Sequence, residues 1–146
     1  MDKFKTVCLN CGAVNAFPVS AEGKKVVCGR CRMPLPRPGE VLEPAEEGAL
    51  EKLLLNPSLP VLVDFYSNAC PPCRVMHPVI ERLAGRRRGE ILVTRVDVER
   101  HPGLASKFGI QATPTFVILN RGYEIARTTG ASSESEFSLW AAGAAR

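Results

Sequence analysis

The sequence has no hydrophobic run long enough to cross a membrane, and its first residues do not resemble an export signal. A membrane-spanning helix needs about 20 mostly apolar residues in a row. The N-terminal residues Met1–Lys5 lead directly into Thr6-Val7-Cys8, without the apolar core of a signal peptide. We therefore expect a cytosolic protein that does not enter a membrane.

The chain also lacks a strong charge of either sign. Its formal charge is +4, and all of the excess lies in residues 1–40, which hold seven Lys or Arg and three Asp or Glu. Four thiolates bound to one zinc ion in that segment would reduce its charge to about +2. This is too little to indicate a nucleic-acid partner, and we interpret the basic run at 86–88 as a solvated helix end.

Residues 1–40 have few apolar side chains apart from their cysteines. A segment of this kind cannot build a sufficient core without a metal or disulfides. Residues 33–44 contain four prolines in twelve positions, which is typical of a semi-rigid linker rather than a packed element. We therefore predict an N-terminal module at 1–38 and a larger domain at 39–146.

No cysteine lies outside a Cys-x-x-Cys pair. The six cysteines form three such pairs: Cys8/Cys11, Cys28/Cys31 and Cys70/Cys73. In a reducing cytosol, closely spaced cysteines are more often metal ligands or catalytic groups than structural disulfides. The same spacing can serve either role, so the context of each pair decides between them.

The first two pairs have the spacing of a metal site. Sixteen residues separate them, which fits the C-x2-C, 15–20 residues, C-x2-C pattern of zinc sites. Four thiolates without an open position describe a structural zinc ion rather than a catalytic one. Gly12 and Gly29 are expected to give the two knuckles backbone freedom. Two local disulfides, four free thiols or an iron–sulfur cluster are the alternatives. The expected ligands are Cys8, Cys11, Cys28 and Cys31.

The rest of the chain alternates between helix and strand patterns. Apolar spacing predicts helices at 45–55, 75–83, 102–108 and 133–145, and strands at 61–66, 91–98, 115–119 and 124–129. This order predicts an α/β fold with a mixed sheet covered by helices on both faces.

The third cysteine pair lies between a predicted strand and a predicted helix. Cys70 is expected at or near the helix N-cap, where the helix dipole and free N–H groups stabilise a thiolate. Pro71 suits the first helical position, and Pro72 removes the next donor, so the N–H of Cys73 is the nearest one to Cys70. This context predicts a redox dithiol. A chance pair of helix cysteines or an unpartnered metal knuckle is the alternative.

Residues 61–130 resemble thioredoxins. The shared motifs are Val-Leu-Val-Asp-Phe-Tyr, Cys-x-Pro-Cys, Val-Asp-Val-Glu and Phe-Gly-Ile-Gln-Ala-Thr-Pro-Thr-Phe, followed by Gly130-Ala131. With its two N-terminal pairs, the whole chain resembles the zinc-containing thioredoxin-2 type of bacterial thioredoxin. The resemblance implies a thioredoxin fold, with a mixed central sheet and helices on both faces, preceded by a small zinc ribbon-like module.

The resemblance also implies roles for individual residues. Cys70 matches the attacking cysteine and Cys73 the resolving one. Asp64 matches the buried acid that helps to deprotonate the resolving thiol through water, and burial in an apolar strand should raise its pKa. Thr113 and Pro114 match the cis-proline segment that faces the dithiol and lines the substrate groove.

The centre departs from the family pattern at two positions. The usual motif is Trp-Cys-Gly-Pro-Cys, whereas this chain has Ala69 for the tryptophan and Pro71 for the glycine. Both changes bear on redox poise and substrate contacts. Arg95 stands where the family often has a lysine near the buried acid. We expect Trp140 to pack in the last helix, and His77 to have a surface or packing role.

The resemblance implies a cytosolic thiol-disulfide oxidoreductase that reduces protein disulfides. Its cofactors would be one structural zinc ion and the redox-active disulfide Cys70–Cys73. Its partners would be disulfide-bearing proteins and a flavoprotein thioredoxin reductase that uses NADPH, and we expect a monomer. A disulfide isomerase or oxidant is one alternative. A zinc-ribbon interaction module on a degenerate thioredoxin scaffold is the other.

Overall fold

The larger part of the molecule is built on a five-stranded mixed sheet. The computed structural model describes residues 3–21, 24–55 and 59–144. The strand order is β3-β5-β4-β6-β7; the first three strands run parallel, and β6 and β7 are antiparallel to their neighbours. The strands are β3 (Val41–Leu42), β4 (Val61–Tyr66), β5 (Leu92–Asp97), β6 (Thr115–Asn120) and β7 (Tyr123–Thr129).

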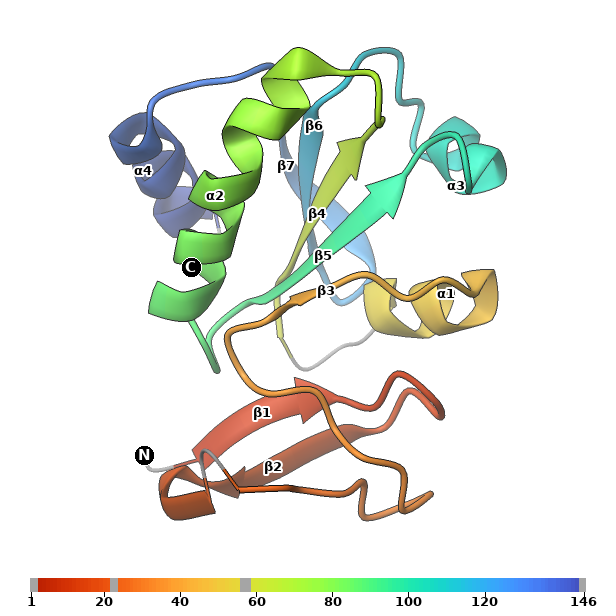
Figure 1. Ribbon diagram of the computed structural model, residues 1–146, viewed down its shortest axis with the longest axis vertical. Coiled ribbons are helices and arrows are strands. Elements are labelled where there is room, and N and C mark those ends of the chain that lie inside the picture. The colour runs from red at the N-terminus through yellow and green to blue at the C-terminus, as the bar shows by residue number, and fades with distance from the viewer. Residues whose placement is uncertain (1–2, 22–23, 56–58, 145–146) are drawn as a thin grey trace.

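Helices cover both faces of this sheet, as the alternating pattern predicts (Figure 1). They are α1 (Glu47–Leu54), α2 (Pro71–Arg86), α3 (Pro102–Lys107) and α4 (Glu134–Ala144). One core lies under α1 and α3 and the other under α2 and α4. All six residues of β4 are buried, because this central strand supplies side chains to both cores. No described helix is long and apolar enough to span a membrane.

The predicted elements are confirmed with shifts at their ends. Helix α2 begins at Pro71 with Cys70 as its N-cap, as the context of the third cysteine pair predicts, and thus four residues before the range that apolar spacing alone predicts. The hairpin between β6 and β7 turns at Arg121 and Gly122, both with positive φ. Ser133 caps α4: its hydroxyl accepts a hydrogen bond from the N–H of Glu136 at 3.2 Å. Asn56 and Pro57, which the sequence predicts to end the first helix, lie outside the described residues.

The prediction that residues 33–44 contain no packed element is wrong. Val41 and Leu42 form β3, a short edge strand that pairs with Val93 and Thr94 of β5. Two apolar residues between prolines are enough to form this short strand, because the backbone of β5 is available for pairing on that side. The edge position also tolerates flanking prolines that lack an N–H.

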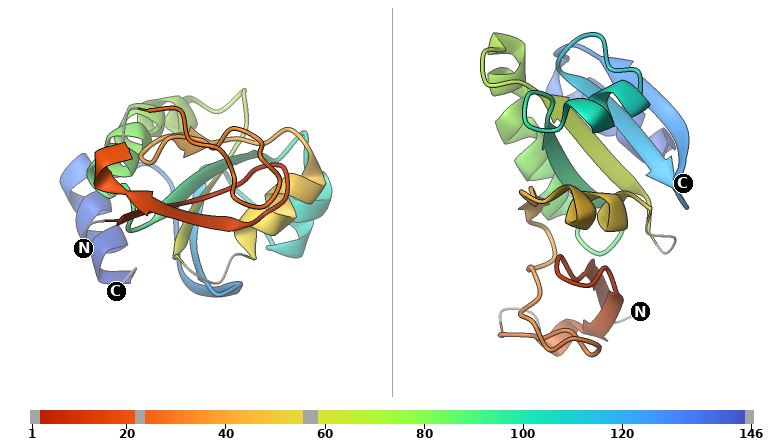
Figure 2. Two further views of the ribbon diagram at one scale, coloured as in Figure 1. Left: turned by 90° about the horizontal axis from the view of Figure 1, so that it is seen from below. Right: turned by 90° about the vertical axis from the view of Figure 1, so that its right-hand side faces the viewer.

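The N-terminal segment, residues 3–38 as far as they are described, has its own small sheet that sequence patterns missed. Strands β1 (Lys3–Val7) and β2 (Val14–Pro18) form an antiparallel pair, followed by the 3-10 turn η1 (Val19–Ala21). The segment lies against one end of the larger sheet, near α1 (Figure 2).

This segment shares contacts with the domain beside it. Val7 is buried in the same core as Leu50 and Leu53 of α1, and Leu9 packs against that core. A side chain added at Gly12 would meet Lys52 of α1 at 2.9 Å, so the first knuckle approaches the helix closely. The N-terminal segment is therefore packed on the domain and not only tethered to it.

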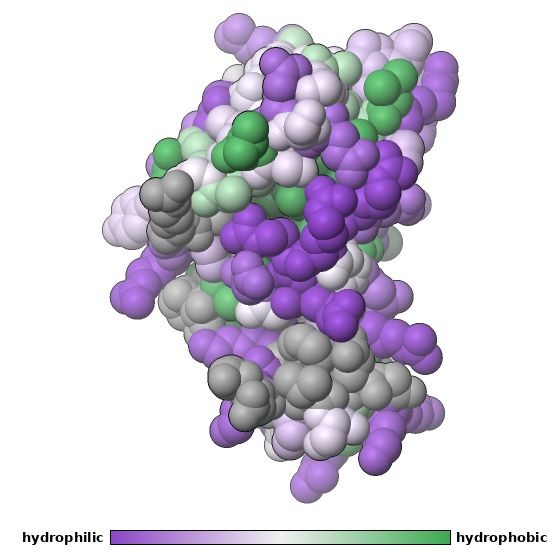
Figure 3. All heavy atoms as spheres, turned by 90° about the vertical axis from the view of Figure 1, so that its left-hand side faces the viewer, coloured by the Kyte–Doolittle hydropathy of each residue, from purple (hydrophilic) through white to green (hydrophobic). Residues whose placement is uncertain are grey.

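The outer face of α2 and α4 is largely hydrophilic (Figure 3). Here Arg82 and Arg86 of α2 both pair with Glu134 of α4, at 2.8 and 3.0 Å. Arg86 also donates a hydrogen bond to Ser138 at 2.9 Å. The basic run thus begins at the C-terminal end of α2, where positively charged side chains interact favourably with the negative end of the helix dipole.

Candidate redox centre and metal site

The third cysteine pair forms a disulfide at the start of α2. Cys70 is the N-cap residue and Cys73 lies in the first turn, with their Cα atoms 5.2 Å apart. The N–H of Cys73 donates a hydrogen bond to Sγ of Cys70 at 3.2 Å, as the two intervening prolines predict. Cys70 is 6% exposed and Cys73 is 1% exposed, so Cys70 is the sulfur that a partner reaches more easily.

The Thr113–Pro114 peptide bond is cis, as the resemblance implies. The N–H of Gly130 donates a hydrogen bond to the carbonyl oxygen of Pro114 at 2.9 Å, and Gly130 has a φ of +92°. The loop before β6 lies at the same end of the sheet as the start of α2 (Figure 1). A cleft of about 280 Å³ runs between Ser67 and Thr113 at this end, and its other lining residues are Val98, Glu99, Ile110, Gln111 and Ala112.

Asp64 is buried beneath this end of the sheet. It is 1% exposed, and neither carboxylate oxygen accepts a hydrogen bond from the residues that the structure describes. Burial raises the pKa of Asp64 to about 7; the nearby charge of Arg95 lowers it and that of Glu43 raises it. Nε of Arg95 lies 3.7 Å from Oδ2 of Asp64. The carboxyl group can therefore gain or lose a proton near neutral pH.

Tyr66 packs on the disulfide and on Arg95, the residue that lies beside Asp64. Its ring is buried in a small cluster with Cys70 and Cys73. The guanidinium of Arg95 lies over the ring, 4.5 Å from its centroid, and His77 meets it edge-on at 5.5 Å.

The polar neighbours of Tyr66 complete this cluster. The Tyr66 hydroxyl donates a short hydrogen bond to Oε2 of Glu43. Burial, and then the hydrogen bond to Glu43, raise the pKa of Tyr66 above its usual range. Burial, and then Arg95, lower the pKa of His77. The packing role predicted for His77 is confirmed by its contact with the Tyr66 ring.

Sequence reasoning did not single out Tyr66 or Glu43. For Tyr66 a signal was available, because residues two apart on a strand point to the same face, and Tyr66 follows Asp64 by two. No comparable signal exists for Glu43, which reaches the site only through the pairing of β3 with β5. Trp140 packs on Phe137 in α4, as predicted, with ring centroids 5.4 Å apart.

The other four cysteines come together in the N-terminal segment. Their sulfur atoms all lie within 4.8 Å of one another. Sγ of Cys8 is 3.5 Å from Sγ of Cys31, and Sγ of Cys11 is 3.6 Å from Sγ of Cys28. Zinc–sulfur bonds of about 2.3 Å in a tetrahedron place the sulfurs about 3.8 Å apart. The four side chains therefore fit one zinc ion.

Nearby N–H groups favour a thiolate at Cys28. The backbone N–H of Arg30 and the side-chain amide of Asn15 donate to Sγ of Cys28, at 3.3 and 3.5 Å. Backbone hydrogen bonding and Asn15 lower the pKa of Cys28 to about 6. A thiolate, rather than a thiol, is the form that binds a metal.

The two knuckles have the same backbone geometry. In each, the first cysteine's carbonyl accepts a hydrogen bond from the residue four positions on, Gly12 at 2.8 Å and Arg32 at 2.9 Å. These two residues have φ angles of +80° and +70°. The expected role of Gly12 is confirmed, but that of Gly29 is wrong, because the equivalent position in the second knuckle is Arg32. Backbone of this kind favours glycine, so Arg32 adopts it against its steric preference.

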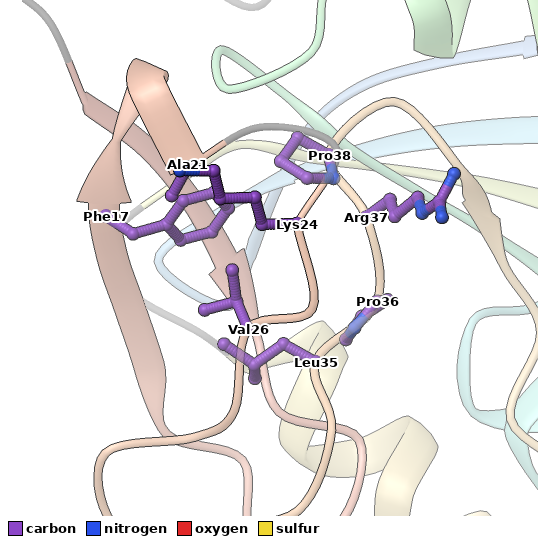
Figure 4. Close-up of a pocket in the computed structure, with 8 residues that line it drawn as sticks. All are labelled: Phe17, Ala21, Lys24, Val26, Leu35, Pro36, Arg37 and Pro38. Atoms are coloured by element: carbon purple, nitrogen blue, oxygen red, sulfur yellow. The ribbon is translucent and has the colours of Figure 1, made fainter.

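A separate cavity of about 260 Å³ lies in the N-terminal segment (Figure 4). Residues from β2, from the turn that follows it and from the proline-rich segment surround it. Its lining residues are Phe17, Ala21, Lys24, Val26, Leu35, Pro36, Arg37 and Pro38. No cysteine is among these described residues, so the cavity is not part of either cysteine site.

The chain matches known proteins over most of its length. The family model for thioredoxin matches residues 41–142. "Thioredoxin C-3" of Corynebacterium nephridii is 32% identical over 134 residues, which cover 92% of this chain and 90% of that protein. Because the alignment covers 92% of this chain, it must include part of the N-terminal segment.

Two further similarities bear on fold and partners. A solved structure of a mutant thioredoxin from Halobacterium salinarum NRC-1 superposes with a TM-score of 0.66 and 28% sequence identity, covering 75% of this chain and 94% of that one. The "Bifunctional thioredoxin reductase/thioredoxin" of Mycobacterium leprae (strain TN) is 33% identical over 82 residues, covering 56% of this chain and 18% of that protein. With its mixed sheet, its Cys-x-x-Cys disulfide and these similarities, the chain has a thioredoxin fold and belongs to the thioredoxin family.

Proposed function

We propose that the protein reduces disulfides in other proteins through the Cys70/Cys73 dithiol, and that its N-terminal segment is a structural zinc module. The observation that carries the proposal is a disulfide at a helix N-terminus, packed on Tyr66 of β4, the strand that also holds the buried Asp64. Membership of the thioredoxin family supports thiol-disulfide exchange as the chemistry.

In the proposed reaction the Cys70 thiolate attacks one sulfur of the substrate disulfide. A mixed disulfide with Cys70 forms, and the other substrate sulfur leaves as a thiolate that takes up a proton. Asp64 accepts the proton of the Cys73 thiol, and the Cys73 thiolate attacks Sγ of Cys70. The second substrate sulfur then leaves, so the substrate gains two electrons and the protein is left with its Cys70–Cys73 disulfide. The cis-proline segment, Thr113 and Pro114, would line the groove that holds the substrate chain.

A second protein must reduce this disulfide again. We infer that a flavoprotein thioredoxin reductase supplies the two electrons from NADPH in the cytosol. The M. leprae relative supports this inference, because its name joins a thioredoxin reductase and a thioredoxin in one chain.

The zinc module follows from the four-cysteine cluster. Zinc would be held by Cys8, Cys11, Cys28 and Cys31, and with no open position it would supply structural stability rather than chemistry. This cluster supports a thioredoxin of the zinc-containing thioredoxin-2 type, and the alignment with "Thioredoxin C-3" extends into the segment that holds it. The boundary between the module and the domain, at residues 38 and 39, is part of this proposal.

Disulfide reduction is tested with insulin and dithiothreitol, and by trapping. We expect the wild-type protein to accelerate insulin reduction at least about tenfold over background, and the Cys70→Ser variant to lose this acceleration. The Cys73→Ser variant should accumulate a mixed disulfide on Cys70, because its resolving thiol is absent. Its matched control is the double variant Cys70→Ser/Cys73→Ser, which should trap nothing.

Two results would contradict this function. Insulin reduction at the background rate would favour an interaction module on a degenerate scaffold. A Cys70/Cys73 reduction potential well above that of cytosolic glutathione would favour an oxidant or isomerase.

A further inference from the structure

Asp64, Arg95 and Glu43 form a row of charged side chains on three neighbouring segments of the sheet. Asp64 of β4 is paired in register with Arg95 of β5. On the other side of β5, Leu42 of β3 is paired with Thr94, and the residue after Leu42 is Glu43. Arg95 therefore occupies a strand between two carboxylates, one buried and one at the edge of the sheet.

Glu43 is fixed in this row by Tyr66. The Tyr66 hydroxyl donates a hydrogen bond to the Glu43 carboxylate, although the two residues are 23 positions apart in the sequence. Tyr66 itself is 7% exposed and packs on Cys70 and Cys73. The position of Glu43 is thus set by a side chain that contacts the disulfide.

Glu43 and Arg95 act on Asp64 in opposite directions. The positive charge of Arg95 favours the ionised carboxylate, whereas the negative charge of Glu43 disfavours it. The other charged or titratable groups described on this side are Tyr66 on β4 and Arg74, His77 and Glu81 on α2, while β6 presents the apolar Phe116 opposite Asp64. Nη2 of Arg95 also lies 3.0 Å from Nδ1 of His77.

Solvent reaches this charge row from one side. Glu43, Arg95 and Glu81 line a cleft of about 360 Å³, together with Gly39, Glu40 and Val41. The Glu43 side chain therefore faces a cleft that is open to water.

We propose that Glu43 is a positioning residue of the redox centre: held by the Tyr66 hydroxyl in the cleft that it shares with Arg95, its carboxylate acts against the Arg95 charge beside Asp64. The inference rests on the proposed function, since it concerns the acid that serves the resolving thiol. Glu43 directly follows β3, the first strand after the N-terminal segment.

The experiment follows the carboxyl carbon of Asp64 by NMR across pH in the full-length, zinc-loaded, oxidised protein. Without the Glu43 charge, Arg95 acts unopposed, so Glu43→Gln should lower the Asp64 titration midpoint by roughly 0.5 unit. Tyr66→Phe releases Glu43 and should lower the midpoint by a smaller amount. Glu43→Asp keeps the charge and should restore a midpoint close to that of the wild type.

The matched control is Glu40→Gln. Glu40 lines the same cleft, but its carboxylate accepts a hydrogen bond from the Arg37 backbone N–H at 2.7 Å, so its loss should leave the midpoint unchanged. The inference is overturned if Glu43→Gln titrates like the wild type, or if Glu40→Gln shifts the midpoint equally.

The titration requires no turnover. A failure of disulfide reduction would therefore contradict the proposed function without deciding the role of Glu43. If the protein is active, the pH profile of insulin reduction should move in the same direction as the Asp64 midpoint in Glu43→Gln.

Discussion

The Cys28→Ser variant is expected to lose the proposed zinc ion and the folded structure of the N-terminal segment. Structural zinc contributes about 10–16 kcal/mol of binding free energy in small zinc modules, and this binding is coupled to folding. Since residues 1–40 have little apolar surface of their own, three remaining thiolates should not hold the segment together. Zinc content, measured by atomic absorption, should fall from one ion per chain to none.

The domain should survive this loss in a weakened form. Val7 and Leu9 would leave the core that they share with α1, so the Tm of the remaining domain should fall by roughly 5 °C. The disulfide centre is built from α2, β4 and the loop before β6. Its reactivity with substrate disulfides should therefore persist at a temperature well below the new Tm.

Cys70→Ser is the matched control, because it also removes one cysteine but none of the clustered four. It should retain one zinc ion, and hydrogen exchange in β1 and β2 should match the wild type. Reduced native wild-type protein should have one zinc ion and two titratable thiols. Iron in place of zinc, or full zinc binding by Cys28→Ser, would contradict the structural zinc site.

The second large effect is expected from Asp64→Asn, as a pH-dependent gain in stability. The pKa of Asp64 is about 7 in the folded protein, against 3.8 for an ordinary aspartate. Between these two pH values the folded protein keeps a proton that the unfolded chain has lost. The free energy of unfolding of the wild type therefore falls as pH rises through this window.

Asparagine does not ionise, so the variant escapes this loss. At pH 8 the gain should approach about 4 kcal/mol, from about three pKa units at 1.36 kcal/mol each, while near pH 4 the two proteins should be similar. Turnover should fall on the order of 10²-fold, because the base for the Cys73 proton is gone. Urea unfolding of the oxidised proteins at pH 4, 6 and 8 measures the stability.

Asp97→Asn is a useful contrast. Asp97 is also buried, but its carboxylate accepts hydrogen bonds from Asn68 at 3.2 Å and from the N–H of Glu99 at 2.9 Å. Its replacement should destabilise the protein by about 1–3 kcal/mol. A stability difference for Asp64→Asn that does not change with pH would show that this carboxyl does not titrate as described.

Local sequence patterns were sufficient to predict those parts of the site whose residues lie close together in the sequence. Cys70, two prolines and Cys73 after an apolar strand define the helix start, the donor to Cys70 and the disulfide. The spacing of the other four cysteines predicts their cluster, because each knuckle is a short local turn. The cis-proline could be expected only from the resemblance, since few such bonds are cis in general.

The rest depends on pairing between distant strands. Glu43 meets Tyr66 only because two residues of the proline-rich segment join the edge of the sheet. The strands β1 and β2 lack a strong hydrophobic alternation, and the packing of Val7 on α1 helps to hold them in place. A comparison of the two knuckles would have identified Arg32 as the residue with positive φ in the second knuckle, because it occupies the position that Gly12 has in the first.

The position of the single tryptophan has a practical consequence for spectroscopy. The resemblance places a tryptophan beside the attacking cysteine, whereas here that residue is Ala69 and Trp140 packs on Phe137 in α4. The disulfide instead packs on Tyr66. Intrinsic tryptophan emission therefore follows the integrity of the α2–α4 core, and a stable signal during reduction would not mean that the disulfide is intact. Exchange kinetics in this protein are better followed by thiol labelling or by an added fluorophore near position 69.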